Sequence, residues 1–351
     1  MVERPPGLTY AGSGVDIAAG ERAVELMRSA VARTARPEVV GGIGGFSGLF
    51  DASKIAGMRR PLLATSTDGV GTKVVIARLT GSYATIGIDL VGMVVDDLVV
   101  CGAEPLFMTD YVVSGAVRPE RVAEIVGGIA EGCVLAGCAL LGGETAEHPG
   151  HFGPDEFDLA GAATGVVEAD RLLGADQVAI GDVVIAMASS GLHANGFSLV
   201  RRLISEAGLD LDASPAELGQ PLGAELATPT RIYAKDCLAL ARELDVHAFA
   251  HITGGGLAAN ISRVLPHGAD AVLDRGSWHP PPIFGLLAGL GPVSSDEMER
   301  VFNMGIGMAA IVPPAHAGDA IRLLGTRGVP AWQLGVIVEG TGRARLTGQH
   351  P

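Results

Sequence analysis

Basic residues, aromatic residues and cysteines are all scarce in this chain. Its 351 residues include 25 Lys or Arg against 39 Asp or Glu, a net charge of −14, and only 4% are aromatic. A surface this acidic argues against nucleic acid or an anionic membrane as the main partner. Acidic residues interrupt even the most apolar stretch, 88–108, so no run of about 18 uncharged apolar residues could span a membrane.

The cysteines do not form a metal-binding or disulfide pattern. Cys101, Cys133, Cys138 and Cys237 include no Cys-x-x-Cys pair and have no histidine nearby at the spacing of a zinc site. Free thiols are typical of a reducing compartment. The segment Met1–Gly12 contains charges and prolines instead of the apolar core of a signal peptide. We therefore expect a cytoplasmic protein.

Glycine and apolar residues are abundant, and they predict two folded domains. The chain has 51 glycines and is 48% apolar, and its length suits two domains of ordinary size. Apolar runs of strand type alternate with helical patterns, such as the amphipathic helix expected over Pro119–Ala136 and the helix expected over Thr228–Glu243. The polar, turn-rich passage Arg171–Gly181 predicts a boundary, which gives domains over 1–170 and 171–351. The predicted fold class is α/β (α+β).

The stretch Ser66–Lys73 combines a carboxylate, glycines, hydroxyls and a lysine between two apolar runs. Glycines let a ligand approach backbone N–H groups closely. Lys73 offers a charge to a phosphate, and Asp68 offers a hard oxygen ligand to Mg²⁺. A polar hairpin turn with a solvated lysine is the alternative interpretation.

Two further segments place glycines or carboxylates where a ligand could bind. Gly41–Gly48 has five glycines among eight residues, although no Gly-Lys dipeptide of a nucleotide P-loop occurs anywhere. Gly142–Gly150 follows an apolar run and carries Glu144 and Thr145. Asp97 lies in the expected buried helix 87–100, where a carboxylate is costly unless it is paired or binds a cation. A structural role for Asp97 is as well supported as a ligand role.

In the second half, His193 and Asn195 follow an expected strand over Asp182–Met187. Loops at strand ends are common ligand sites in α/β folds, although an isolated loop histidine often has no such role. A rival motif begins at His251. The glycines Gly254 and Gly256 with Ala259 fit a loose dinucleotide fingerprint. A glycine-rich turn into a helix also binds phosphate esters, which is the interpretation we prefer.

Eight segments in order resemble the phosphoribosylformylglycinamidine cyclo-ligase family, whose members are also called aminoimidazole ribonucleotide synthetases. The resemblance extends from about Tyr10 to Ile337. The segments are Tyr10-x-x-x-Gly14-Val15-Asp16, Arg36–Val39, Gly41–Phe46, Thr67–Lys73, Asp97–Pro105, Gly142–Glu147, His251-x-Thr253-Gly254-Gly255-Gly256 and Phe302-Asn303-x-Gly305-x-Gly307-Met308.

The resemblance implies ATP-dependent ring closure in purine biosynthesis. Formylglycinamidine ribonucleotide and ATP would give aminoimidazole ribonucleotide, ADP and phosphate, through phosphorylation of the formyl amide oxygen. It also implies a two-domain ATP-binding fold, with the N-terminal sheets of two subunits forming a barrel in a homodimer. ATP would then bind near the subunit interface.

The roles of individual residues follow from this resemblance. Phosphoryl transfer needs charge neutralisation and positioning more than covalent help. The expected Mg²⁺ ligands are Asp68, Asp97 and Glu144. The expected ATP contacts are Gly44, Gly45, Phe46, Thr72, Lys73 and Asp97. The expected catalytic residues are His193, which orients the amide or moves a proton, together with Asp68 and Lys73. The expected substrate contacts are Thr145, Asn195, Gly254, Gly255 and Gly256.

One position departs from the family, and four alternatives remain. Many members have a lysine after the N-terminal tyrosine, where this chain has Ala11; Lys54 or Arg59 could replace it. Selenophosphate synthetase and thiamine monophosphate kinase share the superfamily. A dinucleotide-dependent oxidoreductase built on Gly254–Ala259, and a catalytically silent ATP-binding regulator, are the alternatives from other classes.

Overall fold

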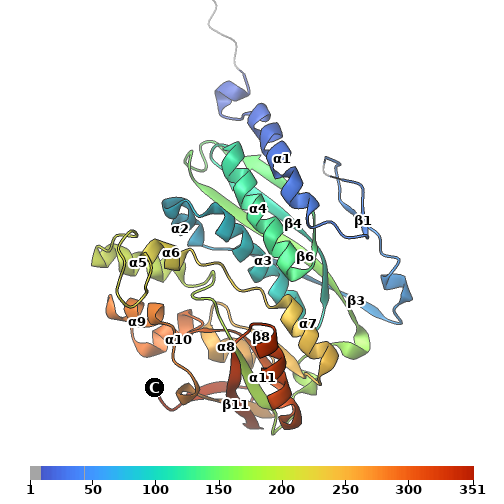
Figure 1. The fold of residues 1–351 in the computed structure, drawn as a ribbon, viewed down its shortest axis with the longest axis vertical. Coiled ribbons are helices and arrows are strands. Elements are labelled where there is room, and N and C mark those ends of the chain that lie inside the picture. Colours follow the sequence, from blue (N-terminus) through green and yellow to red (C-terminus); the bar gives the residue numbers. More distant parts are fainter. Residues whose placement is uncertain (1–8, 43) are drawn as a thin grey trace, which may run out of the picture.

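The computed structural model describes residues 9–42 and 44–351, so Ile43 of the glycine-rich segment lies outside the described residues. The N-terminal unit is built on a four-stranded sheet of order β3-β6-β4-β5 (Figure 1). Its strands are β3 (Pro61–Gly69), β6 (Phe157–Glu168), β4 (Glu104–Ser114) and β5 (Ala139–Glu147). β6 pairs antiparallel with β3 and with β4, whereas β4 and β5 are parallel. Strands β3 and β5 therefore form the two edges.

Helices cover one face of this sheet. α3 (Tyr83–Val99) and α4 (Pro119–Ala136) pack on it, and α1 (Ile17–Ala32) packs on α4. The helix predicted over Pro119–Ala136 is confirmed. A short hairpin of β1 (Val39–Val40) and β2 (Leu49–Phe50) carries the glycine-rich segment between its strands.

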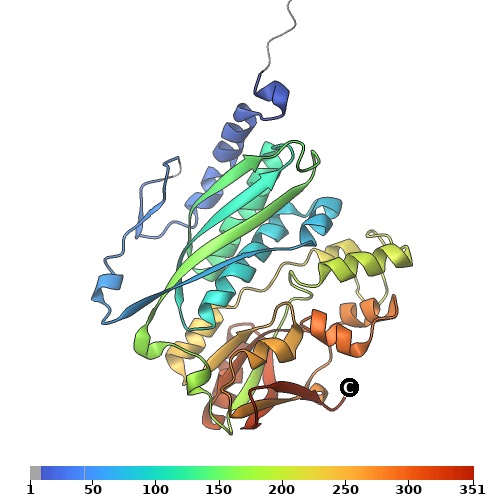
Figure 2. The same ribbon diagram turned by 180° about the vertical axis from the view of Figure 1, so that it is seen from behind.

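None of the described helices covers the other face of the sheet (Figure 2). We call this surface the open face. Its central side chains are uncharged and exposed or part-exposed, whereas alternation and strand register place the exposed carboxylates Asp158 and Glu144 on the same face. The central residues are Leu63, Thr65, Thr67, Thr109, Tyr111, Ala160, Ala162 and Thr164.

The C-terminal unit contains a six-stranded sheet of order β12-β9-β11-β7-β10-β8. The strands are β7 (Val183–Ala188), β8 (Ala248–His251), β9 (Ala269–Asp274), β10 (Ile306–Val312), β11 (Ala331–Glu339) and β12 (Ala344–Thr347). The dinucleotide-binding alternative required β8 and β9 to be parallel neighbours around a helix. They are separated by three other strands, so that alternative is wrong.

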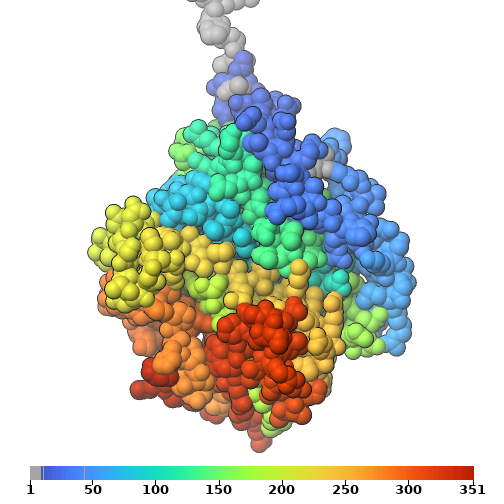
Figure 3. Space-filling model, in the orientation of Figure 1, coloured from blue at the N-terminus to red at the C-terminus, as the bar shows by residue number. Residues whose placement is uncertain are grey.

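The helices of this unit fall into two groups. α8 (Gly256–Ser262) and α11 (Ala317–Thr326) pack against the second sheet, and α7 (Ala234–Glu243) packs on α3 and α11. The helices α5 (Phe197–Ala207), α6 (Leu222–Leu226), α9 (Pro282–Gly289) and α10 (Ser295–Val301) form a separate apolar cluster with Ile76 of α2 (Lys73–Thr80), which follows β3 in the first unit. One apolar core joins the two units, since buried residues of α3 and α4 cluster with residues of β7, α7 and β10. Figure 3 shows the N-terminal unit, in blue and green, packed directly on the yellow-to-red C-terminal unit.

The passage Arg171–Gly181 runs between the last strand of the first sheet and the first strand of the second. The functional division at residue 170 stays a prediction. Among the described helices, none combines the length and apolar character that a membrane span requires.

Candidate active site

Asp68, Asp97 and His251 meet where the two units join. Asp68 lies at the end of β3, Asp97 lies in the last turns of α3, and His251 ends β8. The Nδ1 atom of His251 lies 2.8 Å from an Asp97 carboxylate oxygen. The imidazole is almost completely buried, and none of the described residues hydrogen-bonds its Nε2 atom. Asp97 by contrast is 44% exposed, which leaves part of its carboxylate open to a ligand.

Asp68 shows the electrostatic consequence of this arrangement. Burial raises the pKa of its carboxyl, and the nearby negative charge of Asp97 adds to the rise. A hydrogen bond of 2.7 Å from the Gly69 N–H and the proximity of His251 act in the opposite direction. The two carboxylates repel each other, and the Asp68 carboxyl is half-buried. A divalent cation bound between them would therefore stabilise their ionised forms.

His193 is buried beside this group, on the loop after β7. Its Nε2 accepts a hydrogen bond from the Ser190 N–H at 3.2 Å, so the ring proton resides on Nδ1, which no described residue contacts by a hydrogen bond. Its backbone has φ of 61°, a strained conformation for a residue with a Cβ. Burial holds the pKa of the imidazole well below its ordinary value, and the neighbouring charges of His251 and Lys73 contribute. The ring is therefore a neutral hydrogen-bond donor near pH 7.

Asn195 joins this loop to the glycine turn before α8. Its Oδ1 atom accepts a hydrogen bond from the Gly254 N–H at 3.1 Å, and the Gly256 N–H donates to the Thr253 carbonyl. The structure thus brings Asn195 and the Gly254–Gly256 turn together, as expected. Two of the three N–H groups are already used within the protein, which leaves the Gly255 N–H for a ligand. The expected contact between this turn and the substrate stays a prediction.

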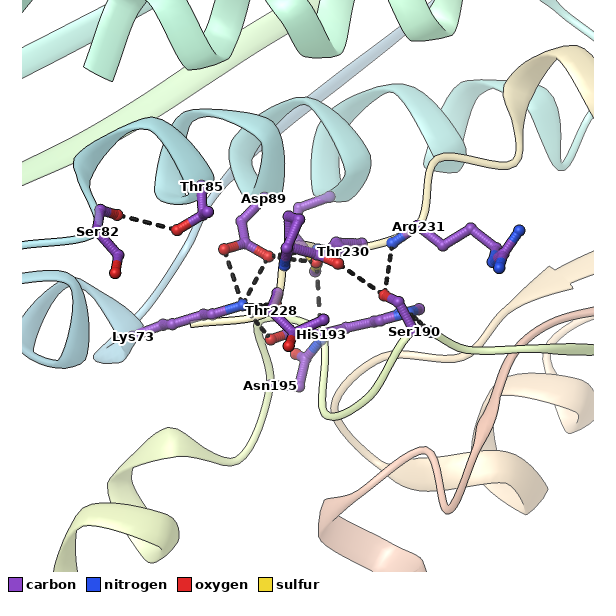
Figure 4. A network of polar contacts seen from close by, with 12 residues as sticks. Lys73, Ser82, Thr85, Asp89, Ser190, His193, Asn195, Thr228, Thr230 and Arg231 are labelled. Carbon is purple, nitrogen blue, oxygen red and sulfur yellow. Dashed lines mark hydrogen bonds and ion pairs between the residues drawn. The ribbon is translucent and has the colours of Figure 1, made fainter. Parts of the chain in front are cut away.

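The prediction that the Lys73 ammonium group contacts a phosphate of ATP was wrong. Its side chain is 2% exposed, and its ammonium group lies 2.8 Å from Asp89. It also donates to the carbonyl oxygens of His193 at 2.9 Å and Thr228 at 2.8 Å (Figure 4). Three protons with three acceptors leave none for a phosphate. Burial lowers the pKa of Lys73, against the stabilising charge of Asp89.

Carboxylates on α3 hold an extended segment of the second unit, and the sequence did not predict this role. Asp89 accepts hydrogen bonds from the N–H and hydroxyl of Thr230 (Figure 4), and Asp96 accepts from the Tyr233 N–H. The helix expected from Thr228 consequently begins only at Ala234. Buried acids in an apolar helix were a signal of partners, but nothing in the sequence identified the partner segment.

Most of the remaining predicted residues line a cavity of about 570 Å³ between α1, α4, β5 and the glycine-rich segment. It contains Gly44, Gly45, Phe46, Glu144 and Thr145. Since β5 and β3 are opposite edges of a four-stranded sheet, Glu144 and Asp68 are separated by three strand spacings, roughly 14 Å. A single metal site shared by Asp68, Asp97 and Glu144 within one chain is therefore wrong. Across the described residues, no cluster of three or more acidic, His or Cys side chains is arranged for a metal ion.

Thr72 lies apart from this cavity, and its hydroxyl is 3.0 Å from that of Ser198 on α5.

Further along the chain, Asn303 stabilises the His193 loop. Its amide donates to the Gly191 carbonyl at 2.9 Å and accepts from the Gly305 N–H at 2.8 Å. The Phe302-Asn303 motif is thus part of the scaffold that positions the site.

Comparison with known proteins agrees with the resemblance seen in the sequence. Residues 52–167 match the family model described as "AIR synthase related protein, N-terminal domain", and residues 179–346 match its C-terminal domain. The chain is 51% identical over 334 residues to the phosphoribosylformylglycinamidine cyclo-ligase of Geobacillus kaustophilus, covering 95% of this chain and 96% of that protein. It is 49% identical to the protein of the same name from Myxococcus xanthus, covering 96% of this chain and 98% of that protein. The chain belongs to the phosphoribosylformylglycinamidine cyclo-ligase family.

Solved structures with the same fold are more distant from this cyclo-ligase family member. Thiamine-monophosphate kinase from Stenotrophomonas maltophilia aligns with a TM-score of 0.66 at 19% identity, covering 94% of this chain and 97% of that one. The hydrogenase maturation protein HypE of E. coli aligns with a TM-score of 0.64 at 18% sequence identity, covering 94% of this chain and 93% of that one. These likenesses concern the fold alone, so the alternatives within the superfamily gain no support over the cyclo-ligases.

The suggested replacements for the usual family lysine, absent at Ala11, do not lie at either site. Lys54 is paired with Glu38, and Arg59 is paired with Asp170. Lys54 and Glu38 line a different cavity, at the far end of the N-terminal sheet. Within one chain neither side chain reaches the residues grouped around Asp68 or Glu144, and their replacement of the lysine stays a prediction.

Proposed function

We propose that this protein converts formylglycinamidine ribonucleotide and ATP into aminoimidazole ribonucleotide, ADP and phosphate, as a step of purine biosynthesis. The observation that carries the proposal is near 50% identity, over almost the full length, to proteins named for this activity. The grouping of Asp68, Asp97, His193 and Asn195 at the junction of the units supports it.

The acidic pair at the junction suits Mg²⁺ bound together with ATP. Mg²⁺ is commonly held by one or two carboxylates plus phosphate oxygens and waters, and Asp68 and Asp97 offer such a pair. When bound, the ion would neutralise charge on the phosphates during transfer to the formyl oxygen. The raised pKa of Asp68 supports this assignment, because a cation would relieve the repulsion between the carboxylates.

The side chains of the C-terminal unit suit the organic substrate. The Nδ1–H of His193 can donate to the formyl amide and orient its oxygen toward ATP. Phosphorylation makes that oxygen a leaving group; the amidine nitrogen then bonds to the formyl carbon, phosphate departs and a proton is lost from nitrogen. Asn195 and the Gly254–Gly256 turn hold the ribonucleotide, with Gly255 offering an N–H for its phosphate. Lys73 acts as a positioning residue through the His193 carbonyl.

A homodimer explains why the predicted site residues form two groups in one chain. The centre of the open face is uncharged, and β3 and β5 are the edges of the sheet among the described strands. A second sheet could cover this face and extend those edges. Pairing β5 of one subunit with β3 of its partner would close an eight-stranded barrel. Glu144 and Thr145 would then approach Asp68 of the partner, together with Thr72, and one site would combine both groups.

The two units have separate tasks in this proposal. Residues 1–170 bind ATP and form the dimer, and residues 171–351 bind the substrate. The cysteines are all free thiols, which supports action in the cytoplasm.

The test is an assay of the purified protein with Mg·ATP and formylglycinamidine ribonucleotide. We expect aminoimidazole ribonucleotide and ADP in equal amounts, with Asp68→Asn losing most of the activity. ADP release without the ring product would contradict the proposal. Full activity in Asp68→Asn would remove the metal role of that residue while leaving the reaction in place.

A further inference from the structure

His251 is the last residue of β8, and its ring is fixed by the sheet and by burial. In the pairing of β8 with β10, His251 lies opposite Met308. The N–H of the next residue, Ile252, donates to the Gly307 carbonyl at 2.9 Å. The side chain of His251 is only 3% exposed. The imidazole therefore occupies one fixed position on the C-terminal unit.

The carboxylate that this ring contacts belongs to the N-terminal unit. Asp97 lies on α3, and the His251 Nδ1 atom, at 2.8 Å, is the one hydrogen-bond partner that the described residues give its carboxylate. The preceding residue, Asp96, is fully buried and accepts from the Tyr233 N–H. Asp97 is partly exposed and keeps oxygen lone pairs free for a ligand. The direction of those lone pairs is set by His251.

The ring acts on Asp97 as a hydrogen-bond donor. Because a carboxylate accepts hydrogen bonds, the ring proton lies on Nδ1, and it stays there whether the imidazole is neutral or charged. The Nε2 atom is fully buried and has no hydrogen-bond partner among the described residues. A leucine would fill this space without leaving a buried nitrogen unpaired. Packing alone therefore does not account for a histidine at this position.

We propose that His251 is a positioning residue, which holds the Asp97 carboxylate in the orientation that binds Mg²⁺ together with Asp68. The inference rests on the proposed use of Mg·ATP, and it adds how the C-terminal unit orients a metal ligand of the N-terminal unit. Mg²⁺ prefers oxygen ligands, so the carboxylates hold the ion and the imidazole acts through one of them. Hydrogen bonds that orient metal ligands in this way commonly contribute about tenfold to a hundredfold in metal affinity.

The test measures how much a divalent cation strengthens nucleotide binding. Calorimetry on the full-length protein would follow the β,γ-imido analogue of ATP, once with excess Mn²⁺ as a probe of the Mg²⁺ site and once with EDTA. The gain in affinity caused by the ion should fall about tenfold or more in His251→Gln, whose amide extends toward the position of Nε2. His251→Asn places an amide N–H near the position of Nδ1 and should keep most of the gain.

The affinity without the ion should be the same in the wild type and in both variants, because the imidazole acts only through the metal ligand. A general defect in folding would lower both affinities. His247 offers a matched control at the opposite end of β8. Its Nδ1 atom lies 2.6 Å from Asp182, in a pair with both side chains largely buried. His247→Gln should cost stability and leave the gain from the ion unchanged.

A full gain from the ion in His251→Gln would overturn this inference alone, and so would an equal loss in His251→Asn and His251→Gln. A second measurement uses the wild type with ¹⁵N-labelled histidine, so it does not depend on the folding of His251→Gln. The Nδ1–H signal of His251, identified by its absence in His251→Asn, should shift when Mg²⁺ is added to the complex with the analogue, and no shift would contradict the inference. A wild-type protein whose affinity for the analogue gains nothing from either ion would overturn the metal role of the acidic pair as well.

Discussion

The Nζ atom of Lys73 lies 2.8 Å from each carboxylate oxygen of Asp89, inside the junction between the two units. Its remaining hydrogen bonds reach the carbonyls of His193 and Thr228 in the second unit, while Asp89 also accepts from Thr230. The pair therefore connects α2 and α3 to the loop that carries His193. A lysine expected at a phosphate instead fixes the geometry of the site.

Lys73→Met should destabilise the protein strongly. It leaves Asp89 charged and buried without a counter-ion, which typically costs about 3–5 kcal/mol. Urea denaturation of Lys73→Met, Asp89→Asn and the double variant would measure this. We expect the double variant to lose clearly less stability than the sum of the two single variants. Additive losses would show that the two charges do not depend on each other.

Gly307→Ala should lower kcat with little change in the KM for ATP. A Cβ there would lie 2.4 Å from Cε1 of His193 and 2.2 Å from the Tyr233 hydroxyl, so the imidazole must shift. A displacement of about 1 Å in an orienting group can cost about a hundredfold in rate. Gly285→Ala on α9 is the matched control, because its Cβ would meet no atom within 4 Å. Unchanged steady-state kinetics in Gly307→Ala would contradict the role of His193.

Asp110→Asn should alter the pH dependence of stability. Burial of its carboxyl on β4 raises the pKa of Asp110 from an ordinary value of 3.8 to about 7. A raised carboxyl pKa gives stability that is fully present below the unfolded value and is lost as pH rises through the folded value. The variant should therefore match the wild type near pH 4 and exceed its stability above pH 7 by a few kcal/mol, since each pKa unit corresponds to about 1.4 kcal/mol.

Thermal or urea unfolding between pH 4 and 8 would measure the difference. Asp96, whose pKa is also about 7, contributes the same trend in both proteins and cancels in the comparison. Glu206→Gln serves as the control, because Glu206 belongs to an exposed ion pair with Arg202 on α5. A constant difference between wild type and Asp110→Asn at every pH would show that the carboxyl does not titrate in this range.

Tyr111→Arg should dissociate the proposed dimer and abolish ring closure while leaving the subunit folded. Tyr111 lies on the open face and is 38% exposed in the single chain, so like charges would meet across the proposed barrel. Light scattering and circular dichroism would report mass and folding. Leu79→Arg is the control, an apolar residue that is 62% exposed on α2, away from the open face. A Tyr111→Arg variant that remains dimeric and active would exclude this face as the interface.

The sequence predicted the elements with clear periodicity and the motifs with distinctive residues. The helix Pro119–Ala136 has its expected bounds because a proline begins it and an apolar face runs along it. The helix expected from Thr228 begins six residues late, because carboxylates of α3 bind the N–H groups of Thr230 and Tyr233. Such tertiary contacts leave no periodic signal in the sequence.

The same limit applies to the site. Asp68 and Asp97 were chosen as carboxylates in unusual settings, and the fold brings them together. Lys73 had the chemistry of a phosphate ligand, but its burial depends on α3 and on residues 228–230, more than 150 positions away. The separation of Glu144 from Asp68 depends on strand order, which no local motif encodes.

The most direct test of the account follows the formyl oxygen during ring closure. The purified protein would be given Mg·ATP and formylglycinamidine ribonucleotide labelled with ¹⁸O in the formyl group, and the inorganic phosphate would be analysed by mass spectrometry. Phosphorylation of the formyl oxygen predicts one ¹⁸O atom in each phosphate released, together with one aminoimidazole ribonucleotide and one ADP. Unlabelled phosphate with the same yield of ring product would contradict the account.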